Sequence, residues 1–182
     1  MLLFAVTTPV YLLMVSANMV ENEMALPDIV FARLLMGLIL VEYFADQQQW
    51  DYQNAKKEYQ KTAKVPAGFQ REDLDRGFIV SGLWAWSRHP NFAAEQSIWV
   101  LLYQWSCYDT QTFYNWTLVG ALSYLFLFQG STWLTERISA GKYPEYKEYQ
   151  RLVGMFVPKL SSIMSDPKEE VNKKVDERKK AE

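Results

Sequence analysis

The stretch Ser87–Glu95, "SRHPNFAAE", holds the chain's single histidine, His89, next to Arg88 and directly before a proline. Arginine binds phosphate oxygens in a bidentate geometry, and histidine can donate to a phosphate or move a proton near neutral pH. Asn91 and Glu95 add an amide and a carboxylate, which suit ribose hydroxyls or a carboxamide. The stretch therefore favours a nucleotide-like ligand, although an Arg-His pair beside a membrane can equally anchor lipid headgroups.

Two further polar clusters have compatible chemistry. The segment "EYFADQQQWDYQ" contains Glu42 and Asp46, which share one helical face, and Gln48. It could also mark nothing more than the end of a helix. The C-terminal cluster supplies cations for phosphates and tyrosines as flat surfaces with hydroxyls, although tyrosines at this spacing also form interfacial stripes. Its residues are Lys142, Tyr143, Tyr146, Tyr149 and Arg151.

Several classes of site are disfavoured. One histidine, one cysteine and scattered carboxylates make a poor zinc or iron site, so we expect no metal. The net charge of -2 argues against a nucleic-acid partner. Neither a Walker loop nor a Gly-x-Gly-x-x-Gly motif occurs, so a soluble dinucleotide-binding fold has no support.

Apolar segments predict an all-α integral membrane bundle of about four transmembrane helices, with cytosolic helices and a charged C-terminal tail. The first segment could instead be a signal peptide, but it lacks a positively charged start. We expect one membrane domain over 1–165 and a tail, disordered or a lone polar helix, over 166–182. The four segments are 1–20, 28–45, 92–108 and 114–134.

Charge distribution predicts the orientation of these helices. The connection 18–27 and the connection 109–113 contain no Lys or Arg, whereas 46–80 and the region from Arg137 onward are rich in both. The positive-inside rule then places both termini and all three polar clusters on the cytosolic side. The final "KKAE" resembles a dilysine retrieval signal, so we expect the endoplasmic reticulum membrane, although it could be ordinary tail charge.

Three segments, read in order, resemble a known family. "GLWAWSRHPNFAAE", "ADQQQWDY" and "TERISAGKYPEYKEYQRLVGMFVP" are similar to motifs of the DUF1295 family, within the steroid 5-alpha-reductase-like superfamily. The resemblance covers roughly residues 40–160. Phe92 and Trp86 stand where the family motif has tyrosines, and each removes a hydroxyl.

The resemblance implies a membrane oxidoreductase that uses NADPH to reduce a carbon-carbon double bond of a steroid-like or other lipid taken from the bilayer. It implies a cofactor pocket that opens to the cytosol and that Tyr143 and Tyr146 help to close. Reduction also needs an acid to protonate the substrate, and Tyr143 or Tyr146 could be this catalytic proton donor. The resemblance implies cofactor contacts at Asp46, Arg88, His89, Asn91 and Glu95. Side-chain chemistry adds Gln48 and Arg151 as candidate cofactor contacts.

Two alternatives stay open. Arg-His-Pro followed by a Glu-containing segment and a Tyr-x-x-Tyr run also resembles the isoprenylcysteine carboxyl methyltransferase-like group, which uses S-adenosylmethionine. Superfamily reductases usually carry further N-terminal helices, and only one segment precedes "ADQQQ" here. We therefore expect an N-terminally short chain. The second alternative is a non-catalytic membrane protein that retains the reductase scaffold.

Overall fold

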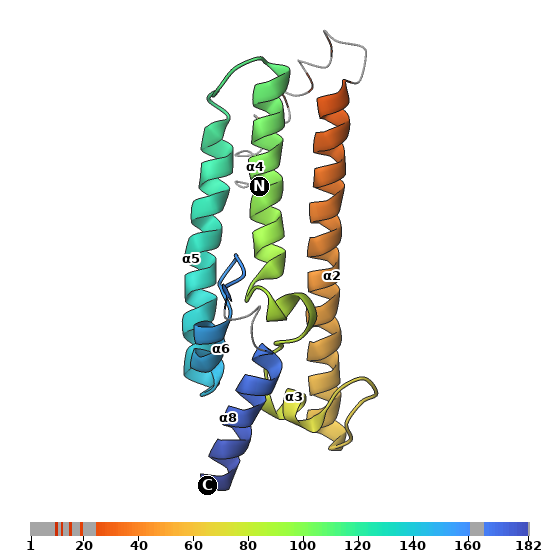
Figure 1. The fold of residues 1–182 in the computed structure, drawn as a ribbon, viewed down its shortest axis with the longest axis vertical. Helices are drawn as coiled ribbons and strands as arrows, with labels where there is room; N and C mark the ends of the chain where they lie inside the picture. The colour runs from red at the N-terminus through yellow and green to blue at the C-terminus, as the bar shows by residue number, and fades with distance from the viewer. Residues whose placement is uncertain are drawn as a thin grey trace. The chain divides into compact units, whose positions relative to one another are not determined.

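The computed structural model describes residues 25–160 and 166–181, together with Val10, Leu12, Val15 and Met19. Its regular elements are helices α2 (Leu26–Thr62), α3 (Arg71–Arg76), α4 (Pro90–Asp109), α5 (Leu118–Lys142), α6 (Tyr146–Leu152) and α8 (Pro167–Ala181), and the 3₁₀ helix η1 (Gly82–Ala85) (Figure 1). Between these described residues the only strand-like pairing is an isolated bridge from Ser87 to Gly154. The predicted all-α fold is confirmed.

Local signals explain where these helices begin and end. Asp28 lies in the first turn of α2 and Lys61 in its last turn, where each charge complements the helix dipole. Helix α4 begins at Pro90, a position at which the missing N–H costs nothing. Helix α3 ends at Gly77, whose φ of 88° is a left-handed cap that favours glycine.

Three of the four predicted membrane segments fall on described helices. Residues 28–45 lie in α2, 92–108 in α4, and 114–134 largely in α5, whereas the prediction for 1–20 falls outside the described residues apart from the four positions named above. Within 25–160 and 166–181, no helix combines the length and the apolar character that crossing a membrane requires.

The chain divides into two compact units. The first unit comprises Met1–Val41 and Phe92–Trp133, and the second comprises Glu42–Asn91 and Leu134–Glu182. Helices α2, α4 and α5 therefore each contribute residues to both units.

In the first unit, α4 lies between α2 and α5 (Figure 1). On one side, Trp105 of α4 stacks on Phe31 at a ring-centroid distance of 5.6 Å, and its indole N–H donates to Asp28. On the other side, Trp99 stacks on Tyr124 of α5 at 4.8 Å. Aromatic pairs at these distances stabilise helix contacts beyond their buried area.

The second unit has two apolar clusters. One gathers Phe78, Val80, Tyr146, Tyr149, Leu152, Val153 and Val171, and the other gathers Tyr52, Ala55, Leu74, Ile79 and Trp84. Hydroxyl groups join the clusters to the backbone, because Tyr52 donates to the Asp73 carbonyl at 2.8 Å and Tyr149 donates to the Trp84 carbonyl at 2.6 Å. These bonds fix α3 onto α2 and η1 onto α6.

The charged tail, expected to be disordered or a lone helix, forms α8, which packs against α3 and α6. Val171 and Val175 lie one helical turn apart and are fully buried. Lys168 forms an ion pair with Asp73 at 2.9 Å, and Asn172 accepts a hydrogen bond from Arg76. An apolar strip one turn long thus fixes a helix that is otherwise polar.

Candidate functional site

The motif Ser87–Asn91 surrounds a buried charged cluster in the second unit. Arg88 binds Glu136 of α5 through both nitrogens of a bidentate pair, with N–O distances of 2.5 and 2.8 Å. The same guanidinium donates to the carbonyls of Gln150 and Val153. His89 Nε2 lies 3.1 Å from Glu136 Oε1. The side chains of Arg88 and His89 are therefore directed at protein groups.

Glu136 is the centre of this cluster, and only about 6% of its surface is exposed. Burial alone would raise the pKa of Glu136, but hydrogen bonds from His89 and Arg88 and the Arg88 charge lower it to about 2. Gln150 adds a further bond to the carboxylate at 3.0 Å. Glu136 is consequently a carboxylate at neutral pH, and it balances the buried Arg88.

Gly154 lets the C-terminal segment turn tightly on itself where it pairs with the motif. Backbone N–H groups of Arg88 and His89 donate to the carbonyls of Gly154 and Met155, at 2.9 and 3.1 Å. A Cβ at Gly154 would lie 1.8 Å from the Val157 carbonyl oxygen, which is closer than any side chain permits. The motif and the C-terminal signature are thus joined by backbone as well as by charge.

The two predicted catalytic tyrosines have different environments. Lys56 donates to the Tyr143 hydroxyl at 2.9 Å and to the Gly77 carbonyl at 2.6 Å. Although burial raises the pKa of Tyr143, hydrogen bonds from Lys56 and Lys142 outweigh it and lower the pKa below its ordinary value. Burial, with the Glu136 charge, instead raises the pKa of Tyr146. Tyr143 is the better placed of the two to release a proton.

Asp46 and Asn91 join the first two motifs. The Asn91 side-chain amide donates to Asp46 at 2.9 Å, while Asn91 Oδ1 is shielded from solvent and receives no hydrogen bond from the described residues. Gln48 accepts from the backbone N–H of Leu83 at 3.0 Å, so its amide fixes η1 to α2.

A groove of about 510 Å³ runs along the same stretch of α2. Asp46 lines it, and Gln49 lines it with an Oε1 that is shielded from solvent and unbonded to any described residue. Lys57 is its single cation. The remaining lining residues are Tyr43, Gln47, Trp50, Gln53 and Asn54. We name this feature the Asp46 groove.

Two further predicted cofactor residues have other hydrogen-bond and ion-pair partners. Glu95 belongs to the first unit, where it accepts a hydrogen bond from the Trp99 indole at 2.9 Å. Arg151 is largely exposed and pairs with Glu148 at 2.6 Å and with Glu170 at 3.8 Å. Their roles as cofactor contacts stay predictions.

Glu136 and Lys56 belong to the site but were not predicted from the sequence. Glu136 lies inside the quoted C-terminal motif, and it is the first charged residue after the uncharged segment 114–134. That position was a usable signal, because a carboxylate at the end of such a segment needs a cationic partner. Lys56 gave no comparable signal, since it is one of several lysines on a polar stretch of α2.

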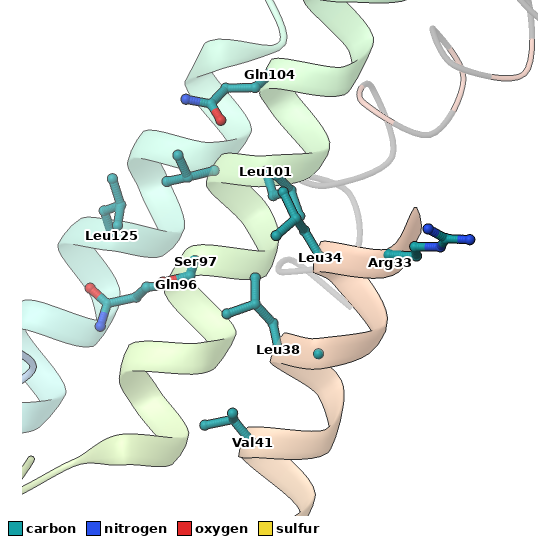
Figure 2. A pocket seen from close by; sticks show the side chains of 11 residues that line it. Arg33, Leu34, Leu38, Val41, Gln96, Ser97, Leu101, Gln104 and Leu125 are labelled. Atoms are coloured by element: carbon teal, nitrogen blue, oxygen red, sulfur yellow. The ribbon is translucent and has the colours of Figure 1, made fainter. Parts of the chain in front are cut away.

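A second, open cavity of about 640 Å³ lies within the first unit and is lined by α2, α4 and Leu125 of α5 (Figure 2). Its walls are mainly Leu34, Leu38, Val41, Val100 and Leu101, with Gly37 on α2. We name it the Gly37 cavity. Across the described ranges, no group of three or more His, Cys, Asp or Glu side chains is arranged to hold a metal ion.

Comparison with known proteins identifies the family but no named activity. An uncharacterized protein of Schizosaccharomyces pombe is 41% identical over 160 residues, which is 87% of this chain and 46% of that relative. The chain therefore spans less than half the length of this relative. No solved structure matches the chain. The family model described as "Protein of unknown function (DUF1295)" matches residues 1–153. The resemblance carried by the three motifs is confirmed, and the chain belongs to the DUF1295 family.

Proposed function

We propose that this chain is part of a membrane oxidoreductase that uses NADPH to reduce a carbon-carbon double bond of a lipid. The observation that carries the proposal is the meeting of the three motifs in the second unit, beside the Asp46 groove. Asn91 bonds Asp46, Arg88 bonds Glu136, and Lys56 bonds Tyr143. Polar groups of these types, beside an open groove, are typical of a site that orients a ligand.

The residues of the Asp46 groove fit the nucleoside portion of such a cofactor. Asp46 can accept hydrogen bonds from ribose hydroxyls, and the unbonded Gln49 Oε1 can accept from another donor. Lys57 can neutralise one phosphate. Arg88 and His89 would act indirectly, by fixing the backbone that carries Asn91, because their polar groups already bind Glu136.

NADPH would supply the hydride, and this chain would supply the proton. Tyr143 Oη is the proposed donor, because the Lys56 ammonium would stabilise the phenolate left after proton transfer to the second carbon of the double bond. Solvent would then return the proton to Tyr143. Replacing Tyr143 by Phe should abolish reduction while leaving NADPH affinity within about twofold of wild type.

Placement in a membrane rests on the surface of the first unit. Large apolar side chains are exposed there on α2 and α5, among them Leu34, Met36, Val119 and Phe126. Surfaces of this kind mark contact with lipid or with another protein. We propose the endoplasmic reticulum membrane with both termini cytosolic. The "KKAE" signal lies partly outside the described residues, and changing Lys179 and Lys180 to serine should release the protein from that compartment.

A substrate-independent assay tests the activity. Purified protein would be incubated with a lipid extract and NADPH carrying deuterium at the transferable position, and the lipids would be analysed by mass spectrometry. We expect a lipid that has gained one deuterium and one proton, and we expect no such product from the Tyr143→Phe variant. Absence of any deuterated lipid, in folded protein that binds NADPH, would contradict the reductase proposal.

One observation favours a second candidate, a non-catalytic membrane protein that retains the scaffold. Arg88 and His89 of the central motif are both buried and bound to protein groups, as a purely structural motif requires. A thermal-shift panel of NADPH, NADH and S-adenosylmethionine separates the possibilities. A rise in unfolding temperature with NADPH would support the reductase function. A rise with S-adenosylmethionine would indicate a methyltransferase instead. No rise with any of the three ligands would favour a non-catalytic membrane protein.

A further inference from the structure

Helix α8 packs against α3 and α6, and the buried residues of α8 lie on one face of the helix (Figure 1). Pro167, Val171 and Val175 are buried at intervals of four residues, whereas Lys173 and Lys174 are exposed. An isolated helix of about 12–15 residues is only marginally stable in water. Because α8 has 15 residues and a polar outer face, its helical structure depends on docking.

The docked helix supplies partners to two buried side chains of α3. Lys168 forms an ion pair with Asp73 at 2.9 Å, and Asn172 accepts a hydrogen bond from Arg76. Arg76 is itself buried, and it also donates to Asp73 and to the Phe78 carbonyl. A guanidinium away from water needs such partners, because an unsatisfied charge there is costly. Release of α8 would remove one partner of Arg76 and lead the guanidinium to move.

Arg76 ends α3 and directly precedes Gly77, which contacts both members of the Lys56–Tyr143 pair. Lys56 Nζ donates to the Gly77 carbonyl at 2.6 Å and to the Tyr143 hydroxyl at 2.9 Å. A Cβ added at Gly77 would lie 2.5 Å from ring carbon Cε1 of Tyr143, so the ring lies directly against the Gly77 backbone. A shift of the backbone at Gly77 would therefore change the distance between Lys56 and Tyr143.

Apolar packing connects α8 to the same pair. Val171 belongs to the buried cluster that contains Phe78 and Tyr146, and Tyr143 packs against this cluster. The ring centroids of Phe78 and Tyr143 are 5.6 Å apart. Removing Val171 would expose part of the cluster to water, which is unfavourable for apolar surface. The cluster would then support Tyr143 less firmly.

We infer that α8 is a detachable clamp, whose docking on α3 and α6 holds the Lys56–Tyr143 hydrogen bond in place through Arg76 and Gly77. When α8 is released, the long helices stay folded while Lys56 and Tyr143 separate. Under the proposed function Tyr143 is the proton donor, so α8 would regulate the rate of reduction, and to that extent the inference rests on the proposed function. The coupling of α8 to Tyr143 needs neither cofactor nor substrate, and it is tested without them.

The test uses the full chain in detergent with a single 3-fluorotyrosine at position 143. The fluorine NMR signal reports the surroundings of this ring, and a Lys56→Met variant provides the signal of the ring without its lysine partner. Hydrogen exchange across 166–181, measured by mass spectrometry, reports separately whether α8 is docked. The two readouts together show whether release of α8 reaches Tyr143.

Val171→Ser removes a buried apolar side chain, so exchange across 166–181 should become about tenfold faster or more. Its fluorine signal should move toward that of Lys56→Met. The matched control is Lys173→Ser, which puts the same residue on the exposed face of α8. Its exchange should stay within about twofold of wild type, and its fluorine signal should not move. Fast exchange of α8 in Val171→Ser with the wild-type fluorine signal would overturn the inference.

A second variant covers the case in which Val171→Ser fails to fold. Asn172→Ala removes the acceptor for Arg76 and leaves both valines in place. Its fluorine signal should move in the same direction by a smaller amount, and an unchanged signal would overturn the path through Arg76. Deuteride transfer at the wild-type rate by a variant whose signal has moved would defeat Tyr143 as the proton donor and leave the inference intact. Absence of deuteride transfer by wild type would defeat the proposed function alone.

Discussion

The two units of the protein differ in where their charged and apolar side chains lie. In the second unit, Lys56, Arg76, Arg88 and Glu136 are charged and buried, and each has a hydrogen-bond partner within the same unit. In the first unit, the buried polar side chains of the described residues are uncharged: Gln96, Ser106, Thr117 and Thr132. Its outer surface is instead apolar, and Phe126 is 73% exposed.

This difference indicates different requirements for folding. The second unit satisfies its buried charges internally, so its geometry is set by directional bonds that tolerate few substitutions. The first unit leaves apolar side chains outward, which is stable only where lipid, detergent or another protein covers them. A self-contained polar unit and an environment-dependent apolar unit are what a protein would need to hold a polar cofactor and an apolar substrate.

The largest expected effect comes from one change made in both units, Glu to Gln. Glu136→Gln leaves Arg88 buried without its counter-charge, and the unfolding free energy should fall by about 3–5 kcal/mol. Glu95→Gln keeps an acceptor for the Trp99 indole and should cost less than about 1 kcal/mol. Denaturant unfolding in detergent measures the unfolding free energy of both variants. An equal loss of unfolding free energy in the two variants would contradict the proposed difference between the units.

Acid should weaken the second unit first. The folded pKa of Glu136, about 2, lies below its ordinary value of 4.5, so its ion pairs contribute fully above the ordinary value and are lost as pH falls through the folded one. The contribution lost is about 3 kcal/mol. Unfolding midpoints followed from pH 6 to pH 2 should drop in wild type and change less in Glu136→Gln. Parallel curves for both proteins would contradict this assignment.

Gly154→Ala should cost about 1–3 kcal/mol, because the added Cβ would overlap the Val157 carbonyl and force the backbone to move. Gly141→Ala, on α5 in the same unit, is the matched control. Its Cβ meets nothing within 4 Å, so this change should stabilise the protein by about 0.5–1 kcal/mol. Thermal unfolding distinguishes them, and a stabilised Gly154→Ala would show that the Val157 carbonyl does not lie against Gly154.

The smallest effect is expected at the surface of the first unit. Phe126→Ser removes an exposed apolar side chain and should change the unfolding free energy in detergent by less than about 0.5 kcal/mol. It should nevertheless reduce the amount of detergent or lipid bound, measured by light scattering during size-exclusion chromatography. Unchanged bound lipid would argue that this face does not contact the membrane.

Much of the architecture could be predicted from the sequence. The apolar segments predicted helices at α2, α4 and α5, and the motif resemblance indicated the family correctly. The docking of α8 was also predictable, since Val171 and Val175 lie four residues apart in an otherwise polar stretch. Composition alone obscured that signal, because the tail as a whole is highly charged.

The direction in which Arg88 points could not be predicted. An arginine in a polar motif can face a ligand or a carboxylate, and the choice depends on where the end of α5 places Glu136. That placement is set by tertiary packing, not by spacing within the motif. The same holds for Tyr143 and Tyr146, whose pKa values shift in opposite directions although the residues are three positions apart.

NADPH titration of purified protein tests the central claim, that the second unit binds the cofactor along the Asp46 groove. Wild type, Asp46→Ala, and the control Glu58→Ala, which removes the same charge from α2 outside the groove, would be compared by calorimetry. We expect binding by wild type and Glu58→Ala, and a loss of about tenfold or more in Asp46→Ala, since the groove loses a charged acceptor. Equal affinity in all three folded proteins, or no binding by wild type, would contradict the account.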